Sequence, residues 1–216
     1  MKKIVLLLLS AFLVFNLSSV SQTKTDKKVT KFEITTDYGT MKGYLYNETP
    51  KHRDNFIKLV KQGFFNGTLF HRVIPGFMIQ GGDPNSKTAK PGQQLGNGDV
   101  GYTVPAEFNP SLIHKKGALA AARQGDEMNP QKASSGCQFY IVEGKKFPAS
   151  QLPAKYTDEQ KKIYETTGGT PFLDGGYTVF GEITNGLDVI DKIANAERDQ
   201  NDRPKKEIKM TVKLTQ

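Results

Sequence analysis

Cysteine, histidine and tryptophan are scarce in this chain of 216 residues, which contains one, three and none of them respectively. Because Cys137 has no second cysteine to pair with, an internal disulfide is excluded and the fold must depend on its hydrophobic core. Cys137 lies in an apolar stretch beside Gln138, so we interpret it as a small buried residue rather than a redox centre.

Several arrangements that carry common chemistry are also missing. The histidines, His52, His71 and His114, lack the spacing of metal ligands, and nothing in the pattern indicates a metal or a cofactor. No paired carboxylates and no nucleophile with a neighbouring base are evident, so a glycosidase or protease lacks support. The formal net charge of +8 is spread along the chain without a nucleic-acid motif, which favours a solvated basic surface over nucleic-acid binding.

The apolar run Ile4–Leu17 is short for a membrane span. It follows a basic pair at residues 2–3 and precedes the small residues Ser19-Val20-Ser21. This order is typical of a secretory signal peptide over residues 1–21, with a retained anchor as the alternative. We therefore expect an exported protein, periplasmic or secreted, without stable membrane insertion.

Removal of the signal peptide would leave a short leader followed by one folded domain. Cleavage before Gln22 would leave residues 22–30, which are rich in Lys and Thr, as a flexible leader. Residues 31–216 would then form the folded domain, which is large enough for a proper core. We expect a monomer.

The spacing of apolar residues along the chain predicts its strands and helices. Residues 32–46 alternate around a turn at Asp37-Tyr38-Gly39, which predicts an antiparallel hairpin. Thr49 as N-cap and Pro50 at the first helical position predict a helix that ends at Gly63.

The C-terminal part of the chain shows the same two periods. Leu187, Ile190 and Ile193 mark a second short helix, and residues 207–214 alternate strictly as in a strand. Many short strands and only two strong core helices predict a mainly β fold with a closed sheet.

The most informative stretch is Phe70–Asp83, which reads FHRVIPGFMIQGGD. A strand-like piece, a Pro-Gly turn and a second apolar piece before two glycines predict a strand, a turn and a returning strand. This geometry would bring the Arg72 guanidinium and the Gln80 amide together. It would also place both groups beside an apolar floor made by Phe77 and Met78.

This stretch closely resembles the signature of the cyclophilins, the cyclosporin-binding class of peptidyl-prolyl cis-trans isomerases. Further blocks in the same order resemble the family: GALAAAR at residues 117–123, SGCQFYI at 135–141 and FLDGGYTVFG at 172–181. The resemblance covers residues 31–216. It implies a closed eight-stranded antiparallel β-barrel capped by two α-helices, with an inserted segment around residues 144–170.

The resemblance also implies the site. Arg72 and Gln80 would be catalytic, with Arg72 stabilising the twisted amide and Gln80 orienting the guanidinium and binding substrate backbone. The implied substrate-binding residues are Phe77, Met78, Ala122, Arg123, Gln138, Tyr140, Phe172, Leu173 and Tyr177. Without the resemblance, the apolar members would be interpreted as ordinary core.

Within this set, the proline pocket would be lined by Phe77, Met78, Tyr140 and Leu173. Gln138 and the backbone at Ala122 and Arg123 would contact the substrate main chain, and Tyr177 would lie at the pocket rim. His71, beside Arg72, would be a structural or groove residue rather than a general base.

Four positions depart from the common family pattern. Tyr140 replaces Phe and adds a hydroxyl at the pocket, Arg123 replaces the Asn of many eukaryotic members, and Tyr177 replaces a frequent His. Phe172 stands where drug-sensitive members carry Trp, so we expect weak inhibition by cyclosporin.

The inserted segment contains Thr157 and Gln160 at the spacing of a capping box, which is compatible with a short helix or with a polar loop.

Two functions fit these residues. The first is an enzyme that accelerates rotation about X-Pro bonds in folding exported proteins, whose proline-containing segments are its partners. The alternative is a non-catalytic chaperone module that binds proline-containing peptides in the same groove.

Overall fold

The N-terminal hairpin forms as its alternating pattern predicts. The computed structural model describes residues 29–90 and 92–215, so the predicted signal peptide and most of the predicted leader lie outside the described residues. Strand β1 (Thr30–Thr36) pairs antiparallel with β2 (Gly39–Leu45), and Phe32 and Ile34 are fully buried. Thr30 pairs with Leu45, so β1 begins one residue before the predicted domain boundary.

Eight strands form one sheet, in which every neighbouring pair is antiparallel. Its order is β10 (Thr211–Thr215), β1, β2, β9 (Val179–Asn185), β6 (Ala118–Ala121), β8 (Phe139–Val142), β4 (Met78–Gly81) and β3 (Phe70–Ile74). The two edges meet through backbone hydrogen bonds, from Phe70 N to the Ile208 carbonyl and from Met210 N to the Thr68 carbonyl, each 2.9 Å. The predicted closed antiparallel barrel is therefore confirmed.

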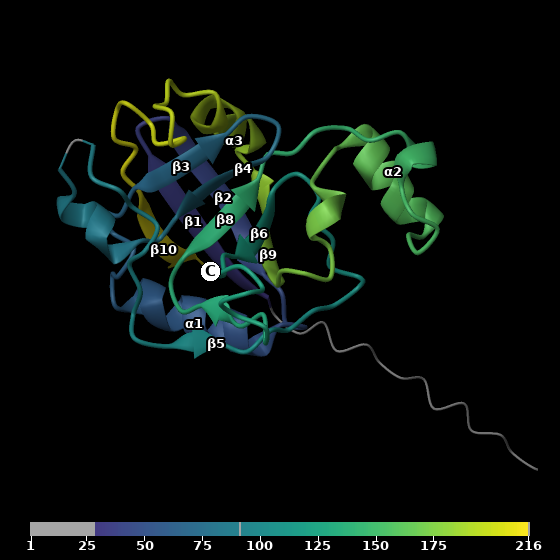
Figure 1. Ribbon diagram of the computed structural model, residues 1–216, viewed down its shortest axis with the longest axis horizontal. Coiled ribbons are helices and arrows are strands. Elements are labelled where there is room, and N and C mark those ends of the chain that lie inside the picture. Colours follow the sequence, from purple (N-terminus) through teal and green to yellow (C-terminus); the bar gives the residue numbers. More distant parts are fainter. Residues whose placement is uncertain (1–28, 91, 216) are drawn as a thin grey trace, which may run out of the picture.

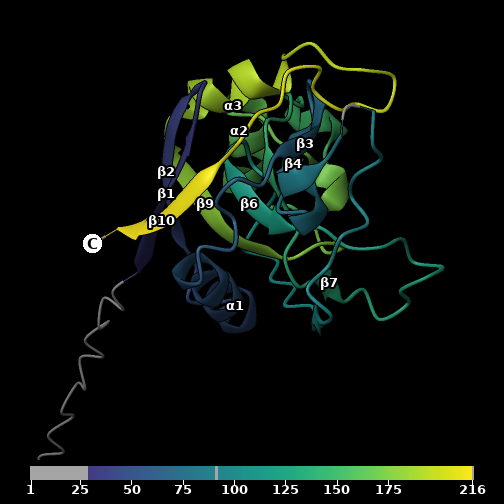
Figure 2. The same cartoon turned by 90° about the vertical axis from the view of Figure 1, so that its left-hand side faces the viewer.

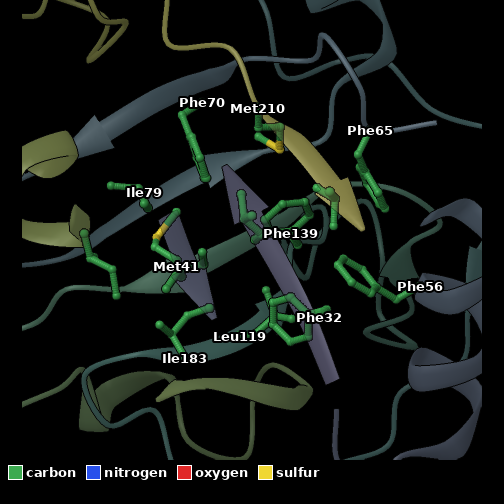
Figure 3. Close-up of a cluster of buried hydrophobic side chains, with 14 of the residues drawn as sticks. Phe32, Met41, Phe56, Phe65, Phe70, Ile79, Leu119, Phe139, Ile183 and Met210 are labelled. Atoms are coloured by element: carbon green, nitrogen blue, oxygen red, sulfur yellow. The ribbon is translucent and has the colours of Figure 1, made fainter. Parts of the chain in front are cut away.

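The interior of the barrel is filled by apolar side chains that alternate along the strands (Figure 3). Phe139 and Ile141 of β8 point into it, whereas Tyr140 and Val142 belong to a second apolar cluster on the outer face. Phe56 packs edge-on against Phe139, with 5.8 Å between ring centroids. The same strands thus build the core and one external surface.

Helix α1 (Pro50–Lys61) begins after Thr49 and is followed by Gly63 at a φ of 65°, as predicted. The expected cap is different, because the Thr49 side chain makes no capping hydrogen bond. Instead the Glu107 carboxylate, distant in sequence, accepts hydrogen bonds from Lys51 N at 3.1 Å and His52 N at 3.0 Å. An anion at a helix N-terminus also suits the helix dipole.

Helix α3 (Leu187–Ala194) lies at the opposite end of the barrel from α1 (Figures 1 and 2). Val189, Ile190 and Ile193 are buried against the barrel, and this agrees with the predicted second helix. The two capping helices therefore confirm the predicted arrangement.

The segment between β8 and β9 carries a third helix, α2 (Asp158–Thr166), which projects to one side of the barrel (Figure 1). Thr157 and Gln160 form the capping box that their spacing allows, so the helix and not the polar loop is present. The remaining short elements are β5 (Thr103–Val104), β7 (Ser134–Ser135) and the 3₁₀ turns η1 (Pro84–Thr88), η2 (Ala149–Gln151) and η3 (Pro171–Leu173). None of the helices in residues 29–90 and 92–215 has the length and apolar character needed to cross a membrane.

Candidate active site

Arg72 and Gln80 face each other across the β3–β4 hairpin. The register pairs Arg72 with Gln80 and Ile74 with Met78, and the intervening turn passes through Gly76 at a φ of 71°. Glycine adopts this left-handed conformation without strain. Arg72 Nη1 donates a hydrogen bond to Gln80 Oε1 at 3.3 Å, and both side chains are half-buried. The structure thus brings the two predicted catalytic side chains into contact.

The Gln80 amide continues into a chain of hydrogen bonds. Gln80 Nε2 donates to Gln138 Oε1 at 3.2 Å, and Gln138 Nε2 donates to the carbonyl oxygens of Gly96 and Gly98 at 2.9 and 2.7 Å. Both hydrogens of the Gln138 amide are therefore engaged, and the residue is 6% exposed. Gln138, which the sequence predicted as a substrate contact, is placed to orient Gln80.

Asp83 holds the other side of the same loop, and the sequence assigned it no role. Its Oδ2 accepts hydrogen bonds from Gly96 N at 2.6 Å and Gly98 N at 3.3 Å, and its Oδ1 accepts from Asn85 N at 2.7 Å. The side chain is completely buried. The sequence signal was its place directly after Gly81-Gly82, but the loop partners are visible only in the fold.

The predicted pocket residues share one surface, the outer face of the sheet beside Gln80. Met78, Tyr140 and Leu173 form its buried part, and Phe77 and Tyr177 pack at its edge. Tyr140 and Tyr177 meet edge-to-face with 6.0 Å between ring centroids. This surface offers an apolar seat next to the Arg72 guanidinium.

Phe172 extends the surface toward solvent. Its ring centroid lies 5.7 Å from that of Phe77, and the residue is 67% exposed. Such exposure of a large apolar side chain is compatible with contact to a ligand. Phe172 therefore lies at the rim rather than inside the pocket.

The hydroxyl of Tyr140 does not reach the pocket as we expected from the sequence. Tyr140 is 5% exposed, and its Oη lies 3.0 Å from Nε2 of the fully buried His114. The two rings are nearly parallel, with 6.0 Å between centroids. Tyr140 consequently presents its ring to the pocket while its hydroxyl is held behind it.

Ala122 and Arg123 differ in what their backbone offers a peptide. Ala122 N donates to the Gln138 carbonyl at 3.0 Å, and the Ala122 carbonyl accepts from Ser135 N at 2.8 Å. Within the described part of the chain, the backbone groups of Arg123 make no backbone hydrogen bond. Of the two predicted main-chain contacts, Arg123 is therefore the one with a free N–H and C=O.

The Arg123 side chain fixes the rim of the site. Its guanidinium lies 4.4 Å from the centroid of the Tyr177 ring, and Nε donates to the Gly176 carbonyl at 2.8 Å. Nη1 forms an ion pair with Asp126 at 2.7 Å. Arg123 thereby links the polar 124–134 loop to Tyr177.

A cavity of ≈460 Å³ adjoins Arg72 and Gln80, and none of its lining residues belongs to the apolar surface. Its walls come from the 92–96 and 199–203 loops, which Arg203 joins by donating from Nη1 to the carbonyl oxygens of Lys90 and Gln93. The cavity lining is mainly polar, with several amide side chains.

His71 also lines this cavity but has no arrangement for acid–base catalysis. It is 4% exposed, and neither ring nitrogen has a hydrogen-bond partner within the described residues. Burial lowers the pKa of His71 to about 4, against the opposing effect of the Asp83 carboxylate. No group of His, Cys, Asp or Glu able to hold a metal ion occurs in residues 29–90 and 92–215.

A serine–histidine–carboxylate arrangement does exist, although the sequence did not reveal it. His52 Nδ1 lies 2.7 Å from Glu107 Oε2, and His52 Nε2 lies 2.9 Å from Ser134 Oγ. Ser134 is 1% exposed and His52 is 3% exposed. Because no substrate reaches a hydroxyl buried in this way, these groups join α1 to β7 rather than form a hydrolytic site.

Comparison with known proteins agrees with this geometry. The family model described as "Cyclophilin type peptidyl-prolyl cis-trans isomerase/CLD" matches residues 31–213. A Staphylococcus saprophyticus protein whose name includes "peptidyl-prolyl cis-trans isomerase" is 37% identical over 159 residues, which are 72% of this chain and 75% of that protein.

Two further comparisons extend the likeness. A Streptococcus pyogenes protein named for both phosphatase and peptidyl-prolyl cis-trans isomerase activity is 36% identical over 184 residues, 82% of this chain but only 37% of that protein. The crystal structure of a cyclophilin type peptidyl-prolyl cis-trans isomerase from Cryptosporidium parvum matches with a TM-score of 0.65 and 26% identity, over 88% of this chain and 99% of that one. The chain belongs to the family of cyclophilin-type peptidyl-prolyl cis-trans isomerases.

Proposed function

We propose that the chain accelerates X-Pro bond rotation in folding exported proteins, with Arg72 as the group that stabilises the twisted amide. The observation that carries this proposal is the hydrogen-bonded pair of Arg72 and Gln80 beside an apolar surface. The Arg72 guanidinium has donors for the polar amide of an X-Pro bond, and the apolar surface beside it can contact the proline ring.

The reaction requires electrostatic help rather than bond-breaking groups. Amide resonance sets a rotation barrier of about 18–20 kcal/mol. When the amide twists, its nitrogen becomes pyramidal and gains a lone pair that a guanidinium N–H can meet. A donor that meets this lone pair binds the transition state more tightly than the planar ground state.

The geometry leaves Arg72 free to act in this way. Within the described residues, its side chain makes a hydrogen bond only from Nη1, to Gln80. The Nε and Nη2 donors remain for the substrate nitrogen and carbonyl. The Gln80–Gln138 chain holds the guanidinium in place, so less orientation entropy is lost when the substrate binds.

The substrate proline is proposed to rest on the surface of Met78, Tyr140 and Leu173, with Phe77 and Phe172 at its rim. The free backbone N–H and C=O of Arg123 would pair with the extended peptide before the proline. The cavity beside Arg72 would take peptide on the other side.

A coupled proline-isomerisation assay tests the role of Arg72. We expect Arg72→Ala to lower kcat/KM by roughly 10²-fold or more, as when one preorganised donor is removed. Arg72→Lys should also fail because a point charge does not reproduce the planar guanidinium. The matched control is Arg53→Ala on α1, which should retain activity. Near-normal turnover by folded Arg72→Ala would refute the mechanism, and peptide binding by the unmodified chain without turnover would favour the chaperone alternative.

The exported location is a proposal from sequence alone, since the segment that motivates it lies outside the described residues. We expect a mature, soluble chain that begins at Gln22. Intact-mass measurement of the protein from the periplasm or medium tests this. A mass that includes residues 1–21, found in the membrane fraction, would show a retained anchor instead.

A further inference from the structure

Asp174, directly after Leu173 of the pocket, is the centre of a buried hydrogen-bond network. Its Oδ1 accepts from His114 N at 2.8 Å and from His114 Nδ1 at 2.6 Å. Its Oδ2 accepts from the hydroxyls of Tyr156, at 2.8 Å, and Tyr164. Four donors therefore satisfy one carboxylate whose side chain is 9% exposed.

Two of these donors come from the inserted 144–170 segment. Tyr156 precedes α2 and Tyr164 lies within it, and they are 6% and 0% exposed. Both pack with Ile113 and Leu152 in a separate apolar cluster beneath the insertion. The insertion is thus attached to the barrel through the residue next to the pocket rather than hanging free of it.

The network continues to the pocket wall. His114 bridges the carboxylate and Tyr140: its Nδ1 lies 2.6 Å from Asp174 Oδ1, and its Nε2 lies 3.0 Å from the Tyr140 hydroxyl. A hydrogen-bonded path therefore runs from Tyr164 through Asp174 and His114 to Tyr140, whose ring lines the proposed proline seat.

A second tie reaches the rim. The Tyr156 hydroxyl shares its single hydrogen between Asp174 and the Pro171 carbonyl oxygen, which is 2.9 Å away. Thr170 N donates to the His114 carbonyl at 2.8 Å. Pro171 begins η3, the turn that carries Phe172 and Leu173. The insertion consequently touches both the wall and the rim of the pocket.

The network is electrostatically matched. Burial raises the pKa of Asp174, but hydrogen bonds from His114 and Tyr164 outweigh it and leave that pKa below its usual value. Burial and the Asp174 charge raise the pKa of both Tyr156 and Tyr164. The Asp174 carboxylate therefore stays charged as an acceptor, and both tyrosine hydroxyls keep their hydrogens as donors.

We propose that Tyr156 and Tyr164 are positioning residues of the isomerase site: through Asp174 and His114 they fix the Tyr140 ring against the substrate proline. The inserted segment is then part of the active-site scaffold. This inference rests on the proposed function, because it assigns the network a role in seating proline.

The test is a double-mutant cycle on kcat/KM. We expect Tyr164→Phe to lower kcat/KM by about tenfold, because a slightly displaced pocket wall weakens alignment of the amide with Arg72. In a Tyr140→Phe background the path is already cut, so the same change should have little further effect. Tyr102→Phe is the matched control, since the Tyr102 hydroxyl bonds to Asn55 outside the network, and it should leave activity unchanged.

A spectroscopic readout separates positioning from general stability. The ¹⁵N chemical shifts of the His114 ring should move in Tyr164→Phe and stay constant in Tyr102→Phe. Unchanged kcat/KM in folded Tyr164→Phe and Tyr156→Phe would overturn the proposal, as would an equal loss with and without the Tyr140 hydroxyl. If Tyr164→Phe does not fold, Tyr156→Phe removes the other donor and decides the matter.

Failure of the proposed function would look different. If the unmodified chain binds proline peptides without isomerising them, the assignment of catalysis to Arg72 fails. The network is then judged by the peptide affinity of Tyr164→Phe: a loss that depends on Tyr140 supports positioning, and an unchanged affinity refutes it.

Discussion

The two faces of strand β8 are held in place by different forces. Phe139 and Ile141 point into the barrel and contact apolar side chains from all around the sheet. Tyr140, between them, faces outward and is held by a hydrogen bond to His114. Gln80, its partner on β4, is held by hydrogen bonds to Arg72 and Gln138.

The difference separates stability from function. Apolar contacts are non-directional, so the interior needs the correct volume and period. Hydrogen bonds are directional, so the outer face can fix a guanidinium or an aromatic ring at one orientation. We therefore expect changes inside the barrel to affect mainly folding, and changes on the outer face to affect mainly turnover.

Phe139→Ala tests the interior side of this comparison and should have the largest effect. Removing a fully packed aromatic ring is expected to lower the free energy of unfolding by about 3–5 kcal/mol. Urea unfolding measures the loss, and kcat/KM per folded molecule should stay close to that of the unmodified chain. A large fall in kcat/KM without a loss of stability would show that the two faces are not independent.

His71 is an exception to this comparison, because its ring is buried and makes no hydrogen bond to any residue that the structure describes. Because burial lowers its pKa from about 6.5 to about 4, the unfolded chain binds the proton first as the pH falls. The contribution of His71 to the free energy of unfolding is fully present above pH 6.5 and is lost as the pH falls toward 4. The total loss is at most about 3 kcal/mol.

Unfolding measured over this pH range checks that prediction. His71→Phe should show a weaker pH dependence than the unmodified chain. His52, whose pKa is also lowered by burial, should retain its own contribution in that variant. An identical pH dependence in both proteins would contradict the assignment to His71.

Phe172→Trp tests the rim of the outer face and should have the smallest effect. Phe172 has no hydrogen-bond donor, so a cyclosporin carbonyl would lose a partner that an indole N–H supplies, at a cost of about 1–3 kcal/mol. We expect the unmodified chain to be an isomerase that cyclosporin inhibits poorly, and Phe172→Trp to gain roughly ten- to a hundred-fold in affinity.

Inhibition titrations of both forms measure this change, and kcat/KM is measured beside them because Phe172 lies at the rim of the proposed proline surface. Tight inhibition of the unmodified chain would show that the donor at this position is unimportant.

Local patterns predicted much of the fold. The N-terminal hairpin and the helix that starts at Pro50 depend on neighbours within a few residues, and the structure confirms both. The spacing of Thr157 and Gln160 left a helix and a polar loop open, and the structure has the helix. The contact between Arg72 and Gln80 was also predictable, because a short hairpin sets their register.

The sequence could not predict hydrogen bonds between residues that come together only when the barrel closes. Glu107 caps α1 in place of the Thr49 side chain, and Asp83 holds the Gly96 loop. Neither pairing follows a local spacing rule, since each joins segments from separate parts of the chain.

By itself, the sequence determined the strand and helix periods, the hairpin that joins Arg72 to Gln80, and the family resemblance. Only the tertiary structure decided that the Tyr140 hydroxyl turns to His114 and that the 144–170 segment supplies two donors to Asp174. The physical reason is the distance along the chain over which each interaction acts. Periodicity and turn chemistry act over a few residues, whereas a buried carboxylate is satisfied by whichever donors the closed barrel brings to it.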